Sequence, residues 1–201
     1  MALVGQRDRL QRRLQRYPTS PCRTPRPVTP EIHLLAGLNG AGKTTRARRL
    51  ADTLPAVRFS LDEWMLQLYE LSFDDELHPR QADKCRELIW DLAAQVLRAG
   101  TSVVLDWNMW SRSRRAEAVR RATDLGVACH LHHVAVPLEV AIQRATDRHD
   151  PRAHRLDADA VRHLAGLFES PEESEGFVLH VEVDNPADRP MDQATTTSPH
   201  P

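Results

Sequence analysis

Lysine is nearly absent from this 201-residue chain. Of its 27 basic residues only Lys43 and Lys84 are lysine, and the other 25 are arginine. The chain also has no excess of positive charge: 28 acidic residues leave a formal net charge of −1. This balance excludes a protein that holds nucleic acid by net charge alone. The arginine excess has a simple source in genomic base composition, but the two retained lysines merit attention.

Long apolar runs and paired cysteines are missing too. No stretch approaches the roughly 20 apolar residues of a membrane span, and the first residues contain no apolar segment of the signal-peptide kind. Three cysteines, Cys22, Cys85 and Cys129, are odd in number and widely spaced. They form neither a disulfide framework nor a metal motif. These absences predict a reduced, cytoplasmic protein with no membrane partner.

Composition divides the chain into three parts. Residues 1–30 contain seven arginines, one aspartate and a proline-rich run, and predict a basic, largely disordered segment. Such a segment binds an anionic partner, acts as an intramolecular latch or is simply a solvated tail. Residues 185–201 have almost no apolar side chains and predict a disordered tail. Residues 31–184 remain as one domain of ordinary size.

Within this domain, strand-like and helix-like segments alternate. The predicted strands are 31–36, 56–60, 102–105, 127–136 and 177–183, and the main predicted helices are 44–54, 80–99, 112–125, 137–148 and 157–168. Alternation at these lengths predicts an α/β fold with a parallel sheet covered by helices on both faces.

A glycine-rich segment, GLNGAGKTT, follows the first strand and matches G-x-x-x-x-G-K-[ST] in full. Glycines let the backbone turn successive N–H groups toward phosphate oxygens, and the next helix adds its positive N-terminal end. The lysine can follow the β/γ phosphates, and the first threonine hydroxyl can bind Mg²⁺. The segment therefore predicts an ATP-binding loop made of Gly37, Leu38, Asn39, Gly40, Ala41, Gly42, Lys43, Thr44 and Thr45.

Two classes of nucleotide-binding protein are excluded by missing motifs. A GTPase needs an Asn-Lys-x-Asp segment to recognise guanine, and neither lysine lies in one. A motor ATPase carries an apolar strand that ends in Asp-Glu, whereas here Trp107 follows Asp106. With these two classes excluded, the remaining motifs favour a kinase.

Carboxylates lie at the ends of the second and third predicted strands. Asp62 is the predicted catalytic base, because a carboxylate beside the loop can accept the proton of a substrate hydroxyl. The alternative for Asp62 is an N-cap for a helix that begins at Glu63, whose own charge would support the helix dipole. Asp106 is predicted to orient Mg²⁺ or to contact the acceptor, and a cap or turn role is its alternative.

The segment DWNMWSRSRR follows the third strand and is predicted to line the acceptor. Asn108, Arg112 and Arg115 are its candidate substrate-binding residues, since arginines at a helix start oppose the helix dipole and are unusual as plain surface charges. Trp107 and Trp110 either stack against the acceptor or pack over the sheet.

Arginines recur near the end of the helix predicted at 137–148. Arg144 and Arg148 are one turn apart and share a face, and Arg152 follows. They predict a lid that closes over the triphosphate, with Arg148 catalytic and the other two nucleotide-binding. The alternative is an exposed basic helix end, which the helix dipole favours without a ligand.

Histidines crowd the fourth predicted strand in the segment HLHH. His130 and His132 would share one face of the strand, and His133 would point to the other. No cysteine or acid completes a metal-ligand set, so these side chains are expected to be surface or strand-end histidines.

Four segments together resemble the P-loop kinase group, which includes polynucleotide kinase, zeta toxin, gluconate kinase and the chloramphenicol phosphotransferases. They are GLNGAGKTT, FSLDEW, VVLDWN followed by SRSRR, and RATDR. The likeness covers roughly residues 31–180 and is strongest to bacterial AAA-family ATP-binding proteins. It implies a P-loop NTPase three-layer sandwich with a five-stranded, mainly parallel, nucleoside-kinase-like sheet and a lid. It also implies phosphate, Mg²⁺, acceptor and lid roles for Lys43, Thr44, Asp62 and Arg148.

The sequence thus predicts an ATP-dependent, Mg²⁺-requiring kinase, monomeric or homodimeric, that acts on a hydroxyl of a small molecule. A 5′-hydroxyl polynucleotide kinase is an alternative, although Trp64 and Met65 stand where such kinases carry an arginine. A nucleotide-dependent binding switch without kinase activity is another.

Overall fold

Five strands form a single parallel sheet in a computed structural model that describes residues 29–69, 75–147 and 156–183. Their order across the sheet is β2-β3-β1-β4-β5. The strands are β1 (Glu31–Ala36), β2 (Ala56–Ser60), β3 (Ser102–Asn108), β4 (Ala128–Ala135) and β5 (Val178–Val183). The predicted α/β sandwich with a five-stranded parallel sheet is confirmed. Apart from residues 29 and 30, the predicted basic segment and tail lie outside the described residues.

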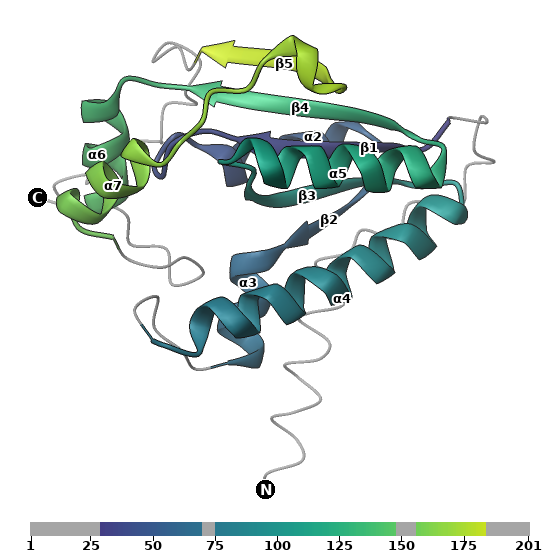
Figure 1. The fold of residues 1–201 in the computed structure, drawn as a ribbon, viewed down its shortest axis with the longest axis horizontal. Helices are drawn as coiled ribbons and strands as arrows, with labels where there is room; N and C mark the ends of the chain where they lie inside the picture. Colours follow the sequence, from purple (N-terminus) through teal and green to yellow (C-terminus); the bar gives the residue numbers. More distant parts are fainter. Residues whose placement is uncertain (1–28, 70–74, 148–155, 184–201) are drawn as a thin grey trace, which may run out of the picture.

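Helices cover both faces of this sheet. Figure 1 shows α4 and α5 in front of the strands, and α2 packs on the opposite face. The helices are α2 (Lys43–Thr53), α3 (Leu61–Leu68), α4 (His78–Arg98), α5 (Arg112–Leu125), α6 (Leu138–Thr146) and α7 (Ala158–Gly166), with a 3-10 turn, η1 (Glu173–Glu175). Among the described helices, none has the length and apolar character needed to cross a membrane.

The core has two parts because successive side chains of a strand point to opposite faces. Ile32, Leu34 and Leu105 face the helices α3, α4 and α5 in the larger cluster. Leu35 and Val104 face α2 in the smaller one. The central strands are therefore apolar on both faces, as expected for a parallel sheet covered by helices.

The strand order places a topological switch point at β1. The chain builds β2 and β3 on one side of β1 and then β4 and β5 on the other. The chain leaves β1 toward β2 and leaves the neighbouring β3 toward β4, in opposite directions across the sheet. Such a reversal opens a crevice at the carboxyl ends of the strands, where ligands bind in open α/β sheets. The predicted loop at residues 37–45 follows β1 at this end.

The strand β3 extends three residues beyond its predicted end. Asp106, Trp107 and Asn108 are consequently strand residues rather than part of a turn, and Asp106 pairs in register with Ser60 of β2. The turn or cap alternative for Asp106 is wrong.

Candidate active site

The loop between β1 and α2 depends on glycine at defined positions. Gly37, Gly40 and Gly42 have φ angles of 146°, 89° and 102°, which side chains rarely adopt. A Cβ atom on Gly40 would lie 2.1 Å from the carbonyl oxygen of Ala141, and one on Gly37 would lie 2.5 Å from that of Val134. The loop is therefore packed directly against the backbone of β4 and α6.

Helix α2 begins at the end of this loop without a side-chain cap. Its N-cap is Gly42, and no side chain accepts a hydrogen bond there. The first N–H groups of a helix have no intrahelical partner, so an anion can satisfy them. Lys43 lies at the same place, and its Nζ donates to the carbonyl oxygens of Gly37 (3.1 Å) and Leu38 (2.9 Å). The ammonium group thus lies within the loop rather than out in solvent.

Thr44 and Asp106 meet because β3 is the neighbour of β1. The Thr44 hydroxyl donates to Asp106 Oδ1 at 3.3 Å. Asp106 is 4% exposed, and burial raises the pKa of its carboxyl group, while the charge and hydrogen bonds of Arg58 oppose that rise. A hydroxyl and a carboxylate oxygen side by side are donors that suit a hard cation such as Mg²⁺. The chemistry of this pair fits the predicted metal role.

Arg58 is a residue of this site that the sequence did not reveal. Its Nε and Nη2 donate to Asp106 Oδ2 at 2.9 and 2.7 Å, and Nη2 also donates to Glu63 Oε1 at 2.8 Å. Burial alone would lower the pKa of the guanidinium, but the larger combined effect of the two carboxylates raises that pKa above its ordinary value. The available signal was a charged residue between Val57 and Phe59, inside a strand, where burial requires a partner.

Asp62 lies in the first turn of α3, which begins at Leu61 with Ser60 as its N-cap. The N-cap alternative for Asp62 is therefore wrong. Asp62 is exposed, and its negative charge contributes to the raised pKa of Asp106, so the two carboxylates interact at one edge of the sheet. Neighbouring Glu63 does more than support the dipole, because it forms ion pairs with arginines of α2 and β2.

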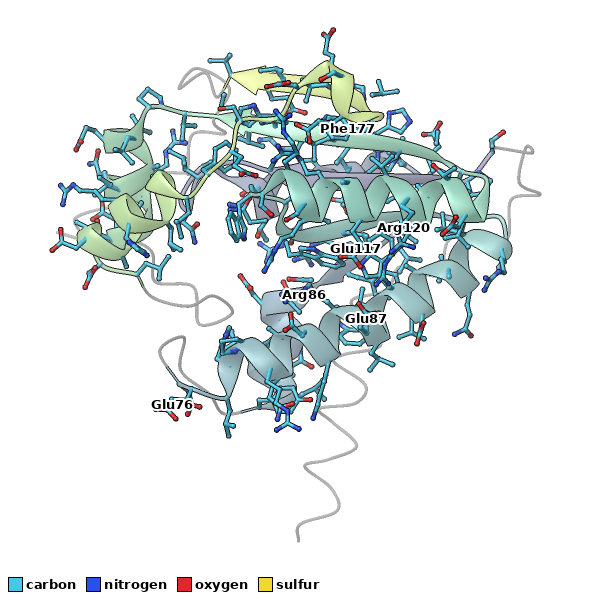
Figure 2. The ribbon with its side chains drawn as sticks, viewed as in Figure 1. Glu76, Arg86, Glu87, Glu117, Arg120 and Phe177 are labelled. Atoms are coloured by element: carbon cyan, nitrogen blue, oxygen red, sulfur yellow. The ribbon has the colours of Figure 1, made fainter. Side chains whose placement is uncertain are left out.

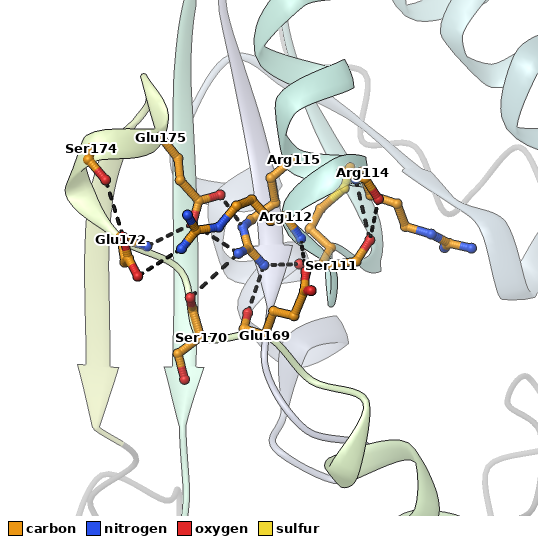
Figure 3. A network of polar contacts seen from close by, with 11 residues as sticks. Ser111, Arg112, Arg114, Arg115, Glu169, Ser170, Glu172, Ser174 and Glu175 are labelled. Atoms are coloured by element: carbon orange, nitrogen blue, oxygen red, sulfur yellow. Dashed lines mark hydrogen bonds and ion pairs between the residues drawn. The ribbon is translucent and has the colours of Figure 1, made fainter.

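Arg115 does not line an acceptor site, contrary to the sequence prediction. Its side chain is fully buried and binds both carboxylate oxygens of Glu175, at 2.7 and 2.9 Å. It also donates to the carbonyl oxygens of Met109 and Glu169, at 3.1 and 2.8 Å. Figure 3 shows Arg115 with Glu169 and Glu175. A guanidinium with these partners joins α5 to the segment before β5 and has no face left for a substrate.

The other candidates on the acceptor side have mixed positions. Arg112 has a side chain that is 56% exposed and pairs with Glu172 at 2.7 Å. Asn108 is half-buried, and its Oδ1 has no partner among the described residues. Trp107 packs edge-on against Trp90 in the core, which favours packing over acceptor stacking. Asn108 Oδ1 is thus a buried acceptor, and Arg112 is the exposed one of these two side chains.

The predicted lid falls largely outside the described residues. Arg148 and Arg152 belong to the segment 148–155 and have no described position. Arg144 lies in the last turn of α6, and α6 packs against α7 through Ile142 and Val161. The lid therefore remains a prediction.

A family model described as an AAA domain matches residues 32–171. The chain belongs to the AAA domain family. The match includes the loop, α3, β3 and α6, and thus every described element that supplies a candidate site residue. A search of curated proteins found no match to this AAA domain.

Solved structures share the fold of this AAA domain. A Chloroflexus aurantiacus protein provisionally assigned as a kinase is 18% identical with a TM-score of 0.62, over 78% of this chain and 89% of that one. Kti12 of Chaetomium thermophilum, solved with ADP-AlF3, is 19% identical with a TM-score of 0.56, over 78% and 92%. A chain of the Pnkp1/Rnl/Hen1 RNA repair complex is 19% identical with a TM-score of 0.59, over 73% of this chain but only 46% of that one. The likeness to P-loop kinases is confirmed at the level of the fold.

The expectation that the HLHH histidines of this AAA domain lie at the surface or at a strand end is wrong. His132 is buried, and His130 and His133 are half-buried within β4. His33, His130, His132 and His180 form a histidine stack across β1, β4 and β5, with ring centroids 4.7 to 5.4 Å apart. The rings meet because the three strands are neighbours, and His132 lies opposite His180 in register. In the described ranges, no three His, Cys, Asp or Glu side chains are arranged to hold a metal ion.

Proposed function

We propose that this AAA domain is an ATP-dependent, Mg²⁺-requiring phosphotransferase that acts on a hydroxyl group of a small molecule. The observation that carries the proposal is the convergence of three groups at one edge of the sheet. These are the glycine loop with Lys43, the hydrogen-bonded pair Thr44 and Asp106, and the exposed Asp62.

Each group has a distinct task in phosphoryl transfer. The N–H groups of the loop and of the first turn of α2 hold the phosphates, and Lys43 provides a positive charge for the oxygens of the transferred group. Thr44 and Asp106 would hold Mg²⁺, which supplies charge neutralisation for the phosphates when it is bound. Asp62 accepts the proton of the acceptor hydroxyl as its oxygen attacks phosphorus. The exposure of Asp62 leaves room for an acceptor beside it.

A polynucleotide 5′-hydroxyl is the alternative acceptor, and the fold likeness to a chain of an RNA repair complex supports testing it. The residues that follow Asp62 argue for a small molecule instead. Met65 is 2% exposed in the core, and Trp64 packs edge-on against Phe59. Neither position provides a cation for a nucleic-acid phosphate.

The direct test is an ATP-consumption screen across nucleosides, sugars and aminoglycoside-type compounds, with a 5′-hydroxyl oligonucleotide as a parallel acceptor. Turnover with a small molecule supports the proposal. Labelling of the oligonucleotide alone would identify the alternative acceptor and contradict the small-molecule assignment.

The Asp62→Asn variant tests the proposed base. We expect turnover to fall by roughly 100- to 10,000-fold, the usual contribution of a general base, with nucleotide binding unchanged. Asp91→Asn is the matched control, because Asp91 is an exposed acid of α4. Full activity in Asp62→Asn would remove this residue from the mechanism.

A further inference from the structure

Arg58 connects two carboxylates that belong to different elements of the site. Its guanidinium comes from β2, Asp106 from β3 and Glu63 from α3. The side chains of Arg58 and Asp106 are 15% and 3% exposed. A guanidinium presents its donors in a rigid planar fork, so two carboxylates bound to one arginine are held in a fixed relation to each other.

Arg58 and Thr44 bind different oxygens of the Asp106 carboxylate. Both hydrogen bonds from Arg58 to Asp106 end on Oδ2, at 2.9 and 2.7 Å. Oδ1 accepts from the Thr44 hydroxyl at 3.3 Å. Arg58 thereby sets the rotation of the carboxylate so that Oδ1 faces the threonine of the glycine loop.

The same arginine closes a circuit between α2 and α3. Helix α2 contributes Thr44 at one end of the circuit and Arg48 at the other, and Arg48 pairs with Glu63 at 3.2 Å. Arg58 pairs with Glu63 at 2.8 Å and with Asp106 at 2.7 Å. Because Glu63 is adjacent to Asp62, the circuit holds the first turn of α3 relative to α2.

We propose that Arg58 is the positioning residue of this site. It aims Asp106 Oδ1 at the cation position beside Thr44, and through Glu63 it holds α3 so that Asp62 faces the acceptor hydroxyl. The second role rests on the proposed function, whereas the first concerns Mg²⁺-dependent nucleotide binding alone. Partners that orient a metal ligand without touching the metal affect affinity strongly, since a ligand's direction depends on them.

The test compares the full-length wild type with Arg58→Met and Arg58→Lys. ADP binding is measured by calorimetry at increasing MgCl₂ concentration and again in EDTA. We expect Arg58→Met to weaken the apparent Mg²⁺ affinity of the nucleotide complex by roughly 10-fold or more, with the affinity for ADP in EDTA unchanged. Arg58→Lys keeps the charge but cannot bridge both carboxylates, so it is expected to show a smaller shift and protects the test against misfolding of the methionine variant.

Arg121→Met is the matched control. Arg121 also joins two carboxylates from two helices, Glu87 of α4 and Glu117 of α5, at 2.7 and 2.6 Å. Figure 2 shows these two acids where α4 and α5 face each other, whereas the glycine loop packs against β4 and α6. Loss of this double ion pair is expected to leave the Mg²⁺ dependence at the wild-type value. An equal shift in Arg121→Met, or a wild-type Mg²⁺ dependence in Arg58→Met, would overturn the proposal.

Glu63→Gln separates the two roles. This variant keeps the pair between Arg58 and Asp106 and weakens the attachment of α3, so we expect wild-type Mg²⁺ dependence with kcat about tenfold lower and KM for ATP unchanged. Unchanged kcat would overturn the role toward Asp62. If the wild type transfers phosphate to no acceptor, the proposed function fails, yet the ADP titrations still decide the role of Arg58 toward Asp106.

Discussion

At the residue scale, identical amino acids in this chain experience very different surroundings. Gly40 and Gly100 both have positive φ angles, of 89° and 84°. A Cβ on Gly40 would meet the backbone of α6, whereas a Cβ on Gly100 would meet nothing within 4 Å. Glycine is therefore needed at position 40 for its positive φ angle and because a side chain would have no room, and at position 100 for its positive φ angle alone.

This difference predicts unequal costs for two alanine substitutions. Gly100→Ala is expected to lower the free energy of unfolding by about 1–2 kcal/mol, the cost of a left-handed alanine. Gly40→Ala is expected to cost more and to reduce nucleotide affinity at least tenfold, because the loop must move away from α6. Urea unfolding and a nucleotide titration measure both effects; equal stability losses with intact binding in Gly40→Ala would contradict the close packing.

At the element scale, two arginines near the start of α5 have opposite surroundings, one exposed and one buried. Ser111 caps the helix by accepting from the Arg114 N–H. Arg115, one turn further, points into the protein, and Arg112 remains largely exposed. Burial would raise the pKa of Glu175, but its hydrogen bonds, with Arg115 first, hold that pKa below its ordinary value. The ion pair thus exists as a charged pair at neutral pH.

Arg115→Met and Arg112→Met test this assignment. Removing Arg115 leaves Glu175 as an uncompensated buried carboxylate, and we expect a loss of about 3–5 kcal/mol in the free energy of unfolding. The exposed pair of Arg112 with Glu172 is expected to contribute no more than about 1 kcal/mol. Chemical denaturation of the two variants measures the difference. Similar small losses would show that Arg115 is not a structural anchor.

At the scale of the whole molecule, the histidine stack makes stability depend on pH. Burial, and then the charge of neighbouring His130, lowers the pKa of His33 to about 4. Burial, and then the charge of Arg46 from α2, lowers the pKa of His132 to about 3. An exposed histidine titrates near 6.5, so below this pH the unfolded chain binds protons that the folded sheet does not.

The free energy of unfolding is therefore expected to be highest above pH 6.5 and to fall as pH decreases toward 4. Each pKa unit corresponds to about 1.4 kcal/mol, so His33 alone predicts a loss of roughly 3 kcal/mol by pH 4. Urea unfolding across this range measures the slope, and His33→Gln should flatten it. His163→Gln, on the exposed side of α7, should leave it unchanged. Equal slopes in the wild type and His33→Gln would contradict this origin.

Local patterns in the sequence determined the kind of fold and the place of the phosphate-binding motif. The alternation of apolar strands and helices depends on neighbouring residues, so each predicted element of the described chain exists, with ends that differ by a few residues. The family match and the parallel sheet confirm the predicted family group and fold class. The roles of the individual site residues remain proposals.

Only the tertiary structure decided which charged side chains are buried, and against what. Arg58 finds Asp106 because β2 lies beside β3, Arg115 finds Glu175 across 60 positions of sequence, and His33 reaches the other rings because β1 lies beside β4. Strand order is set by the packing of distant apolar faces and is absent from any local window. The sequence by itself therefore determined where phosphates are expected to bind, and the order of the strands decided which partners the buried arginines and histidines contact.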